Sequence, residues 1–204
     1  MTITLYYAPF TRATRPRWLL EELGVPYELK VVDLKGGENK SKDYTDTVHP
    51  HGSVPAMRID GEVMIESGAI ITLLADRYPE KGLAPAIDHR DRAKYLQWLF
   101  YTYATIEPAV VAVASHNPTS AYWYGAPLPE REARDRARMK EVVDVVEAGV
   151  SRSDWLLPTF SAADVLVGSV MLWAASMKLC EDRPALAAWF ARCRERPAFQ
   201  RARK

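Results

Sequence analysis

Residues 53–68 of this chain read SVPAMRIDGEVMIESG, and no other stretch constrains the architecture as strongly. Two short apolar runs, Ala56 to Ile59 and Val63 to Ile65, flank Asp60-Gly61-Glu62, which is a signal for a β-hairpin. A helical pattern from Ser67 to Arg77 follows directly. The stretch therefore predicts two antiparallel strands and a helix.

The residues at the two ends of this hairpin indicate a ligand site. Val54-Pro55 is an X-Pro pair, in which a cis peptide bond is accessible, and a cis turn would present the backbone of Val54 as a strand-like edge. Glu66-Ser67 opens the helix, with Ser67 as the expected N-cap and N–H groups that attract an anion. Together they predict a site for a small peptide, with backbone pairing for its amide and a helix end for its carboxylate.

The segments before the hairpin alternate between strand and helix. Ile3 to Tyr7 and Tyr27 to Leu34 predict two strands, and Arg15 to Leu23 predicts a helix closed by Gly24. These elements form a βαβ unit with a parallel strand pair. Lys35 to Lys42 is expected to be a loop. The order βαβ, loop, ββα is that of a thioredoxin-like domain.

No strand signal follows the hairpin and its helix, so the second half is expected to be all-α. We expect an α/β thioredoxin-like domain at 1–78, a Pro- and Gly-bearing linker at 79–88 and an all-helical domain at 89–204. Helices are expected from Asp88 or His89 to Glu107, and at Glu130–Val150, Ser161–Cys180 and Pro184–Arg194. Pro108 is expected to end the first of them, with a continuation from Ala109 to Ser115 after a kink as the alternative. Ser161-x-x-Asp164 resembles a capping box.

Composition excludes several classes of function. The 204 residues carry a formal net charge of +1, so no global field favours nucleic acid or a membrane as a partner. No signal peptide or transmembrane run is visible, and the chain is expected to be cytoplasmic.

The cysteines and histidines are not expected to form a disulfide framework or a metal site. Cys180 and Cys193 are expected to be structural, and His49 and His51 have no Cys or third His close by in the sequence to complete a set of metal ligands. The basic end, 192–204, is expected to be a solvated tail.

Four short motifs occur in the order and spacing of one enzyme family. They are Tyr6-Tyr7-Ala8-Pro9, His49-Pro50-His51-Gly52-Ser53-Val54-Pro55, Glu66-Ser67-Gly68-Ala69-Ile70 and Phe160-Ser161-Ala162-Ala163-Asp164-Val165. With them, essentially the whole chain resembles the cytosolic glutathione S-transferase family. Trp18 to Leu23 looks closest to the bacterial members, and the N-terminal segment is similar to the serine/threonine type.

The resemblance implies a binding role for several residues, with glutathione as co-substrate and no metal. Val54, before the cis Pro55, would pair with the cysteinyl backbone of glutathione. Glu66 and Ser67 would bind its γ-glutamyl group. The residues that would meet its glycine end are Lys42, His51 and Ser53.

The family's thiol-activating residue lies just after the first strand. In the serine-type pattern the hydroxyl lies two residues after the proline, and Thr11 holds that place after Pro9. Tyr7 holds roughly the tyrosine-type place, while Thr14 and backbone amides remain alternatives. No cysteine is present there, so the resemblance does not support a mixed-disulfide mechanism at that position.

The resemblance also predicts a pocket, an assembly and an activity. The aromatic residues expected to wall an apolar electrophile pocket are Phe10, Tyr101, Tyr122, Trp123 and Tyr124. A homodimer is expected, with contacts from Lys94–Glu107 and Ile70–Arg77. The expected function is a detoxifying glutathione transferase that adds the glutathione thiolate to a small apolar electrophile. The alternatives are a glutathione-binding or assembly module without turnover, and a glutathione-dependent reductase or isomerase on the same fold.

Overall fold

The computed structural model describes residues 2–118 and 124–204, which form two compact units. Unit 1 comprises the chain up to residue 86 together with 194–204, and unit 2 comprises residues 87–193. The boundary at residue 86 lies in the expected linker. Residues 194–204, by contrast, were expected in the helical domain and belong to unit 1.

Unit 1 is built on a four-stranded mixed sheet. Its strands are β1 (Ile3–Tyr7), β2 (Glu28–Val31), β3 (Ala56–Ile59) and β4 (Glu62–Ile65). Their order in the sheet is β2-β1-β3-β4, with β1 parallel to β2 and the other two pairs antiparallel. The predicted βαβ unit, the hairpin and the thioredoxin-like topology are confirmed.

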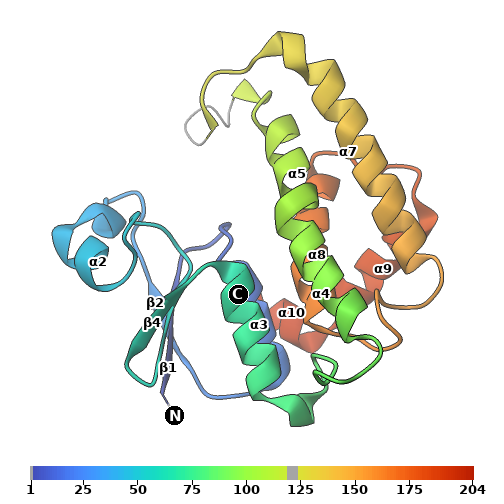
Figure 1. The fold of residues 1–204 in the computed structure, drawn as a ribbon. Helices are drawn as coiled ribbons and strands as arrows, with labels where there is room; N and C mark the ends of the chain where they lie inside the picture. The colour runs from blue at the N-terminus through green and yellow to red at the C-terminus, as the bar shows by residue number, and fades with distance from the viewer. Residues whose placement is uncertain (1, 119–123) are drawn as a thin grey trace. The chain divides into compact units, whose positions relative to one another are not determined.

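Helices cover both faces of this sheet. They are α1 (Thr14–Leu23), α2 (Lys42–Thr47), α3 (Ser67–Arg77) and α10 (Pro197–Ala202), with 3-10 turns η1 (Glu38–Lys40) and η2 (Pro79–Lys81). Helices α1 and α3 pack together, whereas α2 lies on the other side of the sheet (Figure 1). Sequence reasoning gave no helix at α2, because its six residues are mostly polar and only Tyr44 is buried. Ser41 caps α2 by accepting from the Tyr44 N–H.

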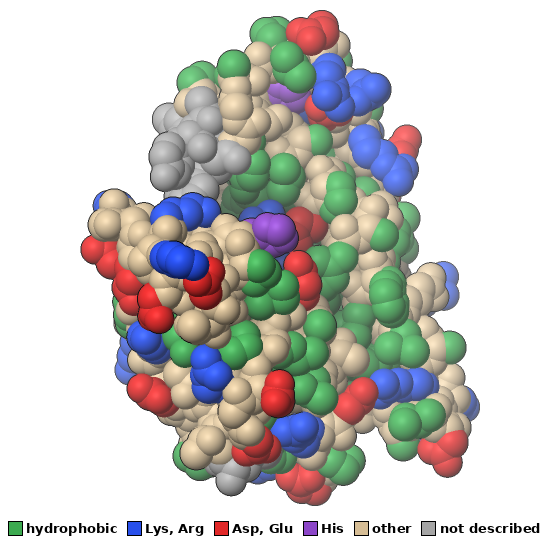
Figure 2. Space-filling view, turned by 60° about the vertical axis from the view of Figure 1, so that its left-hand side comes forward, with side chains coloured by type: hydrophobic (Ala, Val, Ile, Leu, Met, Phe, Trp, Pro, Cys, Tyr) green, Lys and Arg blue, Asp and Glu red, His purple; other side chains and the backbone are tan. Residues whose placement is uncertain are grey.

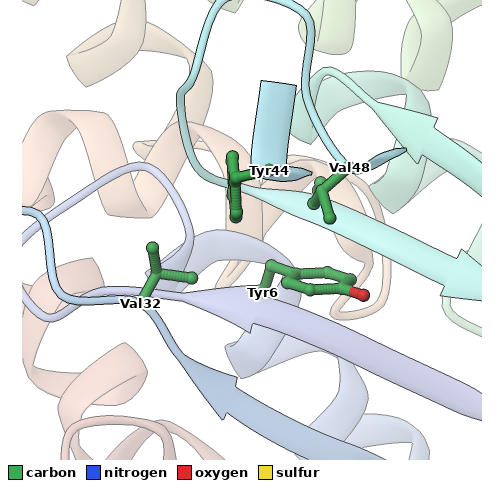
Figure 3. Packing of buried hydrophobic residues seen from close by; sticks show 5 residues of the cluster. Tyr6, Val32, Tyr44 and Val48 are labelled. Carbon is green, nitrogen blue, oxygen red and sulfur yellow. The ribbon is translucent and has the colours of Figure 1, made fainter. Parts of the chain in front are cut away.

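A small apolar cluster joins α2 to the sheet next to the end of β1. Tyr6, Val32, Tyr44 and Val48 pack together (Figure 3), and the Tyr6 and Tyr44 rings meet edge to face with centroids 6.0 Å apart. The Tyr44 hydroxyl also donates to the Ser53 carbonyl at 2.9 Å. The cluster therefore fixes the loop that leads into Val54 relative to β1.

Every regular element among the described residues of unit 2 is a helix. Its elements are α4 (Arg92–Tyr101), the π-helical turn η3 (Thr102–Ile106), α5 (Glu107–Ala114), α7 (Pro129–Val150), α8 (Ala162–Ser176) and α9 (Pro184–Glu195). Helix α5 packs against α7 and α8 (Figure 1). No helix among the described residues is both long and apolar enough to span a membrane.

The expectation that Pro108 ends a helix was wrong, and the alternative, a helix that continues past it, is confirmed. Helix α4 runs into the π turn η3 and then into α5, where Pro108 lies in the first turn. Inside η3 the Thr102 hydroxyl donates to the Trp98 carbonyl at 2.8 Å. A wider π turn and this side-chain bond accommodate a proline that would disrupt a regular helix.

The predicted capping box of α8 is confirmed at the centre of unit 2. Asp164 is fully buried, and its carboxylate accepts from the N–H groups of Leu156 and Ser161, the Ser161 hydroxyl and the Trp189 indole. Burial outweighs these four donors and raises the pKa of Asp164 to about 6.

The charges of the surface are mixed in sign. On the face drawn in Figure 2, basic and acidic side chains are interspersed, and apolar side chains lie between them. This pattern agrees with the net charge of +1.

Candidate functional site

The register of the sheet brings the three N-terminal motifs to one end of unit 1. Tyr6 pairs with Ala56, and Ala56 pairs with Ile65. The chain leaving β1, the Val54-Pro55 entry to β3 and the Glu66-Ser67 exit from β4 therefore lie side by side. The Val54–Pro55 peptide bond is cis, as expected.

Two helices begin at this same end. Helix α1 follows β1, and α3 follows β4 without a loop. Both therefore direct N-terminal N–H groups and positive dipole ends toward the exits of these strands, which favours an anionic ligand there.

The expected N-cap of α3 was wrong by one residue. Glu66 is the N-cap, with φ of 72°, and Ser67 is already helical. Ser67 is buried, and its hydroxyl accepts a long hydrogen bond of 3.4 Å from Arg15 on α1. The left-handed backbone at Glu66 turns the chain directly from strand to helix, which moves the cap back by one position.

Sequence reasoning missed Arg15 as part of this site. Its side chain is buried and reaches Ser67, although it lies 52 residues away in the chain. Nothing in the sequence separates it from its neighbours Arg12 and Arg17, because all three lie within the same basic helix start. Only the packing of α1 against α3 selects Arg15.

Backbone strain marks both sides of the site. Phe10 and Glu66 have φ of 60° and 72°, a region that non-glycine residues rarely adopt. Each immediately precedes a candidate site residue, Thr11 or Ser67. Such strain costs about 1–3 kcal/mol per residue and is found preferentially at functional sites.

The Thr11 hydroxyl stabilises the turn before α1. It donates to the Ala8 carbonyl at 2.7 Å and accepts from the Ala13 N–H at 3.2 Å. The N-cap of α1 is Ala13, and the hydroxyl of Thr14, the alternative activating residue, donates to the Thr11 carbonyl at 2.9 Å. The hydroxyl proton of Thr11 therefore already has an acceptor.

The other candidate hydroxyl, that of Tyr7, points toward α1. Tyr7 is buried, and the guanidinium of Arg17 lies 4.9 Å from the centre of its ring. Burial lowers the pKa of Arg17, but hydrogen bonds with Tyr7 and Tyr27 outweigh it and raise that pKa above its ordinary value. Tyr7 thus has a partner inside the fold.

The cation beside the His51–Ser53 loop is Lys40. Its ammonium group donates to the carbonyls of His51 and Gly52 at 3.0 and 3.1 Å. Lys42, the residue expected there, is exposed and pairs with Asp46 one turn along α2 at 2.5 Å. The 3-10 turn η1, which sequence reasoning missed, orients Lys40 toward the loop.

The same loop is fixed by Asn39. Its side-chain amide donates to the Gly52 carbonyl at 2.6 Å, while its Oδ1 is buried and has no hydrogen-bond partner. Gly52 has φ of 57°, and a Cβ there would lie 2.3 Å from the Asn39 carbonyl oxygen. The close approach of η1 to the loop thus requires glycine.

The two histidines of the loop differ in environment. His49 is buried, its Nδ1 accepts from the His51 N–H at 3.2 Å, and burial lowers its pKa. The His51 side chain is exposed. Within residues 2–118 and 124–204, no group of three or more His, Cys, Asp or Glu side chains is arranged to hold a metal ion.

The residues expected to wall the electrophile pocket are distributed over both units. Phe10 belongs to unit 1 and is 96% exposed. In unit 2, Tyr101 meets Trp98 edge to face, and the Tyr124 ring stacks on Trp173 with centroids 6.5 Å apart. Tyr122 and Trp123 lie outside the described residues. The pocket as a whole stays a prediction.

Comparison with known proteins agrees with this geometry. Residues 1–76 match the family model described as the glutathione S-transferase N-terminal domain. Glutathione S-transferase F10 of Arabidopsis thaliana is 30% identical over 98% of this chain and 95% of the relative. The disulfide-bond oxidoreductase YfcG of Escherichia coli is 30% identical over 98% of this chain and 94% of its own length.

A solved structure extends the likeness to the whole fold. The crystal structure of a glutathione transferase from Methylococcus capsulatus superposes with a TM-score of 0.84 at 28% identity, covering 99% of this chain and 97% of the other. Identity over nearly the full length, the matching fold and the convergence of the three motifs lead to one conclusion. The chain belongs to the glutathione S-transferase family.

Proposed function

We propose that this enzyme binds glutathione at the end of the unit 1 sheet and adds its thiolate to a small apolar electrophile. The observation that carries the proposal is the register that joins Tyr6, Ala56 and Ile65, because it gathers the three motifs at one edge. A strand-like backbone at Val54 and two helix N-termini suit a short anionic peptide.

Each part of glutathione has a proposed partner. The cysteinyl backbone would pair with Val54, preceding Pro55, and the γ-glutamyl carboxylate would accept hydrogen bonds at the start of α3 from backbone N–H groups and the Ser67 hydroxyl. The carboxylate of Glu66 would pair with the γ-glutamyl ammonium. For the glycine carboxylate we propose Lys40 in place of Lys42, with His51 and Ser53 beside it, since Lys40 lies against that loop.

The chemistry requires a thiolate at neutral pH. A free cysteine thiol has a pKa of about 8.5, and lowering it by two units requires roughly 2.7 kcal/mol of preferential stabilisation. One hydrogen bond from a hydroxyl to a charged acceptor supplies about 1.5–3 kcal/mol, from which about 1 kcal/mol is lost when the hydroxyl gives up an existing bond, and a helix N-terminus adds about 0.3–1 kcal/mol. Thr11 lies at the start of α1 and is the proposed donor. The thiol proton passes to solvent, and the sulfur forms the new bond to the electrophile, which in the case of an aryl halide loses its halide as an ion.

The proposal includes a cytoplasmic homodimer acting in detoxification. The large apolar side chain of Phe100 on α4 is 71% exposed, within the segment expected at the subunit contact. Light scattering at micromolar concentration should give twice the mass of 23.0 kDa. A monomer mass would contradict this part of the proposal.

A glutathione-dependent disulfide reductase is the second candidate. The likeness to the E. coli disulfide-bond oxidoreductase, at 30% identity over 98% of this chain, is the observation that favours it. Neither cysteine of this chain suits a thiol mechanism, because Cys193 is buried and burial raises the pKa of Cys180 to about 11. A reductase on this scaffold would therefore rely on the thiol of glutathione alone.

Calorimetry with glutathione tests the binding site. Ser67→Ala should weaken binding by about 1–3 kcal/mol, or roughly five- to a hundredfold. Ser169→Ala is a matched control, because the Ser169 hydroxyl donates to a carbonyl within α8 of unit 2. The assignment fails if the wild type does not bind glutathione or if Ser67→Ala binds it unchanged.

A turnover assay separates the two candidate activities. The transferase should consume glutathione and an aryl halide in equal amounts. The reductase should instead convert a small disulfide to two thiols while oxidising two molecules of glutathione. Binding without either turnover would identify a binding module.

A further inference from the structure

The last eleven residues of the chain, 194–204, fold onto α1. Helix α10 packs along α1 within unit 1, and this contradicts the expectation of a solvated basic tail (Figure 1). We propose that Arg196, Phe199 and Arg201 form a C-terminal clamp that positions α1, and with it the glutathione site at the start of that helix. The part of this inference that concerns glutathione rests on the proposed function.

The strongest contact of the clamp is a two-pronged ion pair. Arg196 donates from Nε and Nη2 to the two carboxylate oxygens of Glu22, at 2.6 and 2.7 Å. The Trp18 indole donates to the same carboxylate at 2.8 Å. The Glu22 side chain is only 6% exposed, so these donors take the place of water around its carboxylate. Parallel bonds of this kind fix orientation as well as adding energy.

A second ion pair holds the adjacent residue of α1. Arg201 donates from Nε to the Glu21 carboxylate at 2.6 Å and from Nη2 to the Glu21 carbonyl at 3.0 Å. The Tyr27 hydroxyl donates to the other oxygen of that carboxylate at 2.7 Å. Arg17, whose guanidinium lies over Tyr7, also donates to the Arg201 carbonyl at 3.4 Å. The clamp thus reaches the end of β1 through α1.

Apolar packing fills the space between the two ion pairs. The Phe199 ring meets the buried Trp18 edge to face, with centroids 4.8 Å apart. Helix α1 precedes unit 2 in the sequence and α10 follows it, so the clamp contacts join two segments that are far apart in the chain. Residues 194–204 therefore complete unit 1.

The clamp acts on the site through the rigid helix α1. Thr11 lies in the turn that starts α1, and Arg15 on its first turn contacts Ser67. A helix is stiff over ten residues, so a change in how its C-terminal half is held displaces its N-terminal end. Glu22 and Arg196 are therefore positioning residues and do not themselves touch the ligand.

The test uses the full chain with Arg196→Gln and Glu22→Gln. Arg192→Gln is the matched control. Arg192 lies four residues earlier and is equally exposed, at 28% against 29%, and it also pairs with an acid, Asp154 of unit 2. For each protein, hydrogen exchange measures the exchange rate of the backbone amides along the chain, and calorimetry measures the affinity for glutathione. Both experiments are done well below the melting temperature.

The clamp predicts a localised effect. Arg196→Gln and Glu22→Gln should each speed exchange of the α1 amides by at least about tenfold, because each variant weakens or loses the two charge-assisted bonds between these side chains, and leave α7 and α8 unchanged. Both should weaken glutathione binding at least threefold, whereas Arg192→Gln leaves α1 exchange and glutathione binding at the wild-type values.

The possible failures are distinguishable. If the α1 amides exchange at the wild-type rate in both variants, the clamp does not hold α1, and the inference is overturned whether or not glutathione binds. If α1 loosens but glutathione affinity is unchanged, the positioning role is overturned. If the wild type itself binds no glutathione, the proposed function fails, while the exchange data still decide whether the clamp exists.

Discussion

Thr11→Val tests thiol activation, and the structure sets the size of its effect. The Thr11 hydroxyl donates to the Ala8 carbonyl at 2.7 Å. To donate to a thiolate it must give up that bond, which contributes about 1 kcal/mol net. A bond to a charged acceptor contributes about 1.5–3 kcal/mol, so the net preference for thiolate is about 0.5–2 kcal/mol. Removing the hydroxyl should therefore raise the pKa of bound glutathione by about 0.4–1.5 units.

The same substitution also weakens the turn before α1, so a control is needed. Thr11→Val loses the bonds to Ala8 and Ala13 and should lower the free energy of unfolding by about 1–2 kcal/mol. Thr14→Val loses a comparable bond in the same turn, from its hydroxyl to the Thr11 carbonyl. It should cost about 1 kcal/mol of stability and leave the thiol pKa unchanged. Thr11→Ser should retain the wild-type pKa.

The assay is the ultraviolet absorbance of the bound thiolate, titrated against pH for each variant. An equal pKa in wild type and Thr11→Val would refute activation by Thr11. A shift in Tyr7→Phe instead would assign the role to Tyr7, despite its contact with Arg17. If neither substitution moves the titration, backbone amides stabilise the thiolate or no activation occurs.

Two further predictions concern stability. Gly52→Ala places a Cβ 2.3 Å from the Asn39 carbonyl oxygen, at a residue with φ of 57°. Urea unfolding should therefore show a free energy of unfolding lower by at least about 2 kcal/mol, and glutathione binding should be weaker. Wild-type values for both would contradict the required close approach. Burial raises the pKa of Asp164 to about 6. As the pH falls from 6 toward 4, Asp164 therefore binds a proton in the folded protein but not yet in the unfolded chain. This proton uptake removes an unfavourable buried charge and stabilises the folded state. As the pH falls from 6.5 to 4.5, the wild type should therefore gain about 2 kcal/mol of unfolding free energy relative to Asp164→Asn. A difference between the two proteins that does not change with pH would show that Asp164 does not titrate in this range.

The sequence by itself determined the elements whose signals are local. The two short apolar runs that flank Asp60-Gly61-Glu62 predicted the hairpin, and Gly24 ends α1 with φ of 65°, as expected of a helix stop. The Ser161-x-x-Asp164 pattern predicted a capping box that forms as written. Such features depend on residues within a few positions of one another, so the sequence contains all the interacting groups in one short stretch.

Tertiary structure decided which charged side chains lie beside the candidate site and which contact α1. Lys40 and Lys42 are two residues apart in one lysine-rich segment, and only the turn η1 directs Lys40 toward the His51–Gly52 carbonyls. Likewise, Arg196 in a basic C-terminal segment resembles any solvated arginine until Glu22, 174 residues away, meets it. The periodicity of a sequence does not predict which acidic and basic residues form ion pairs. Pairs between residues this far apart can therefore be identified only in the folded structure.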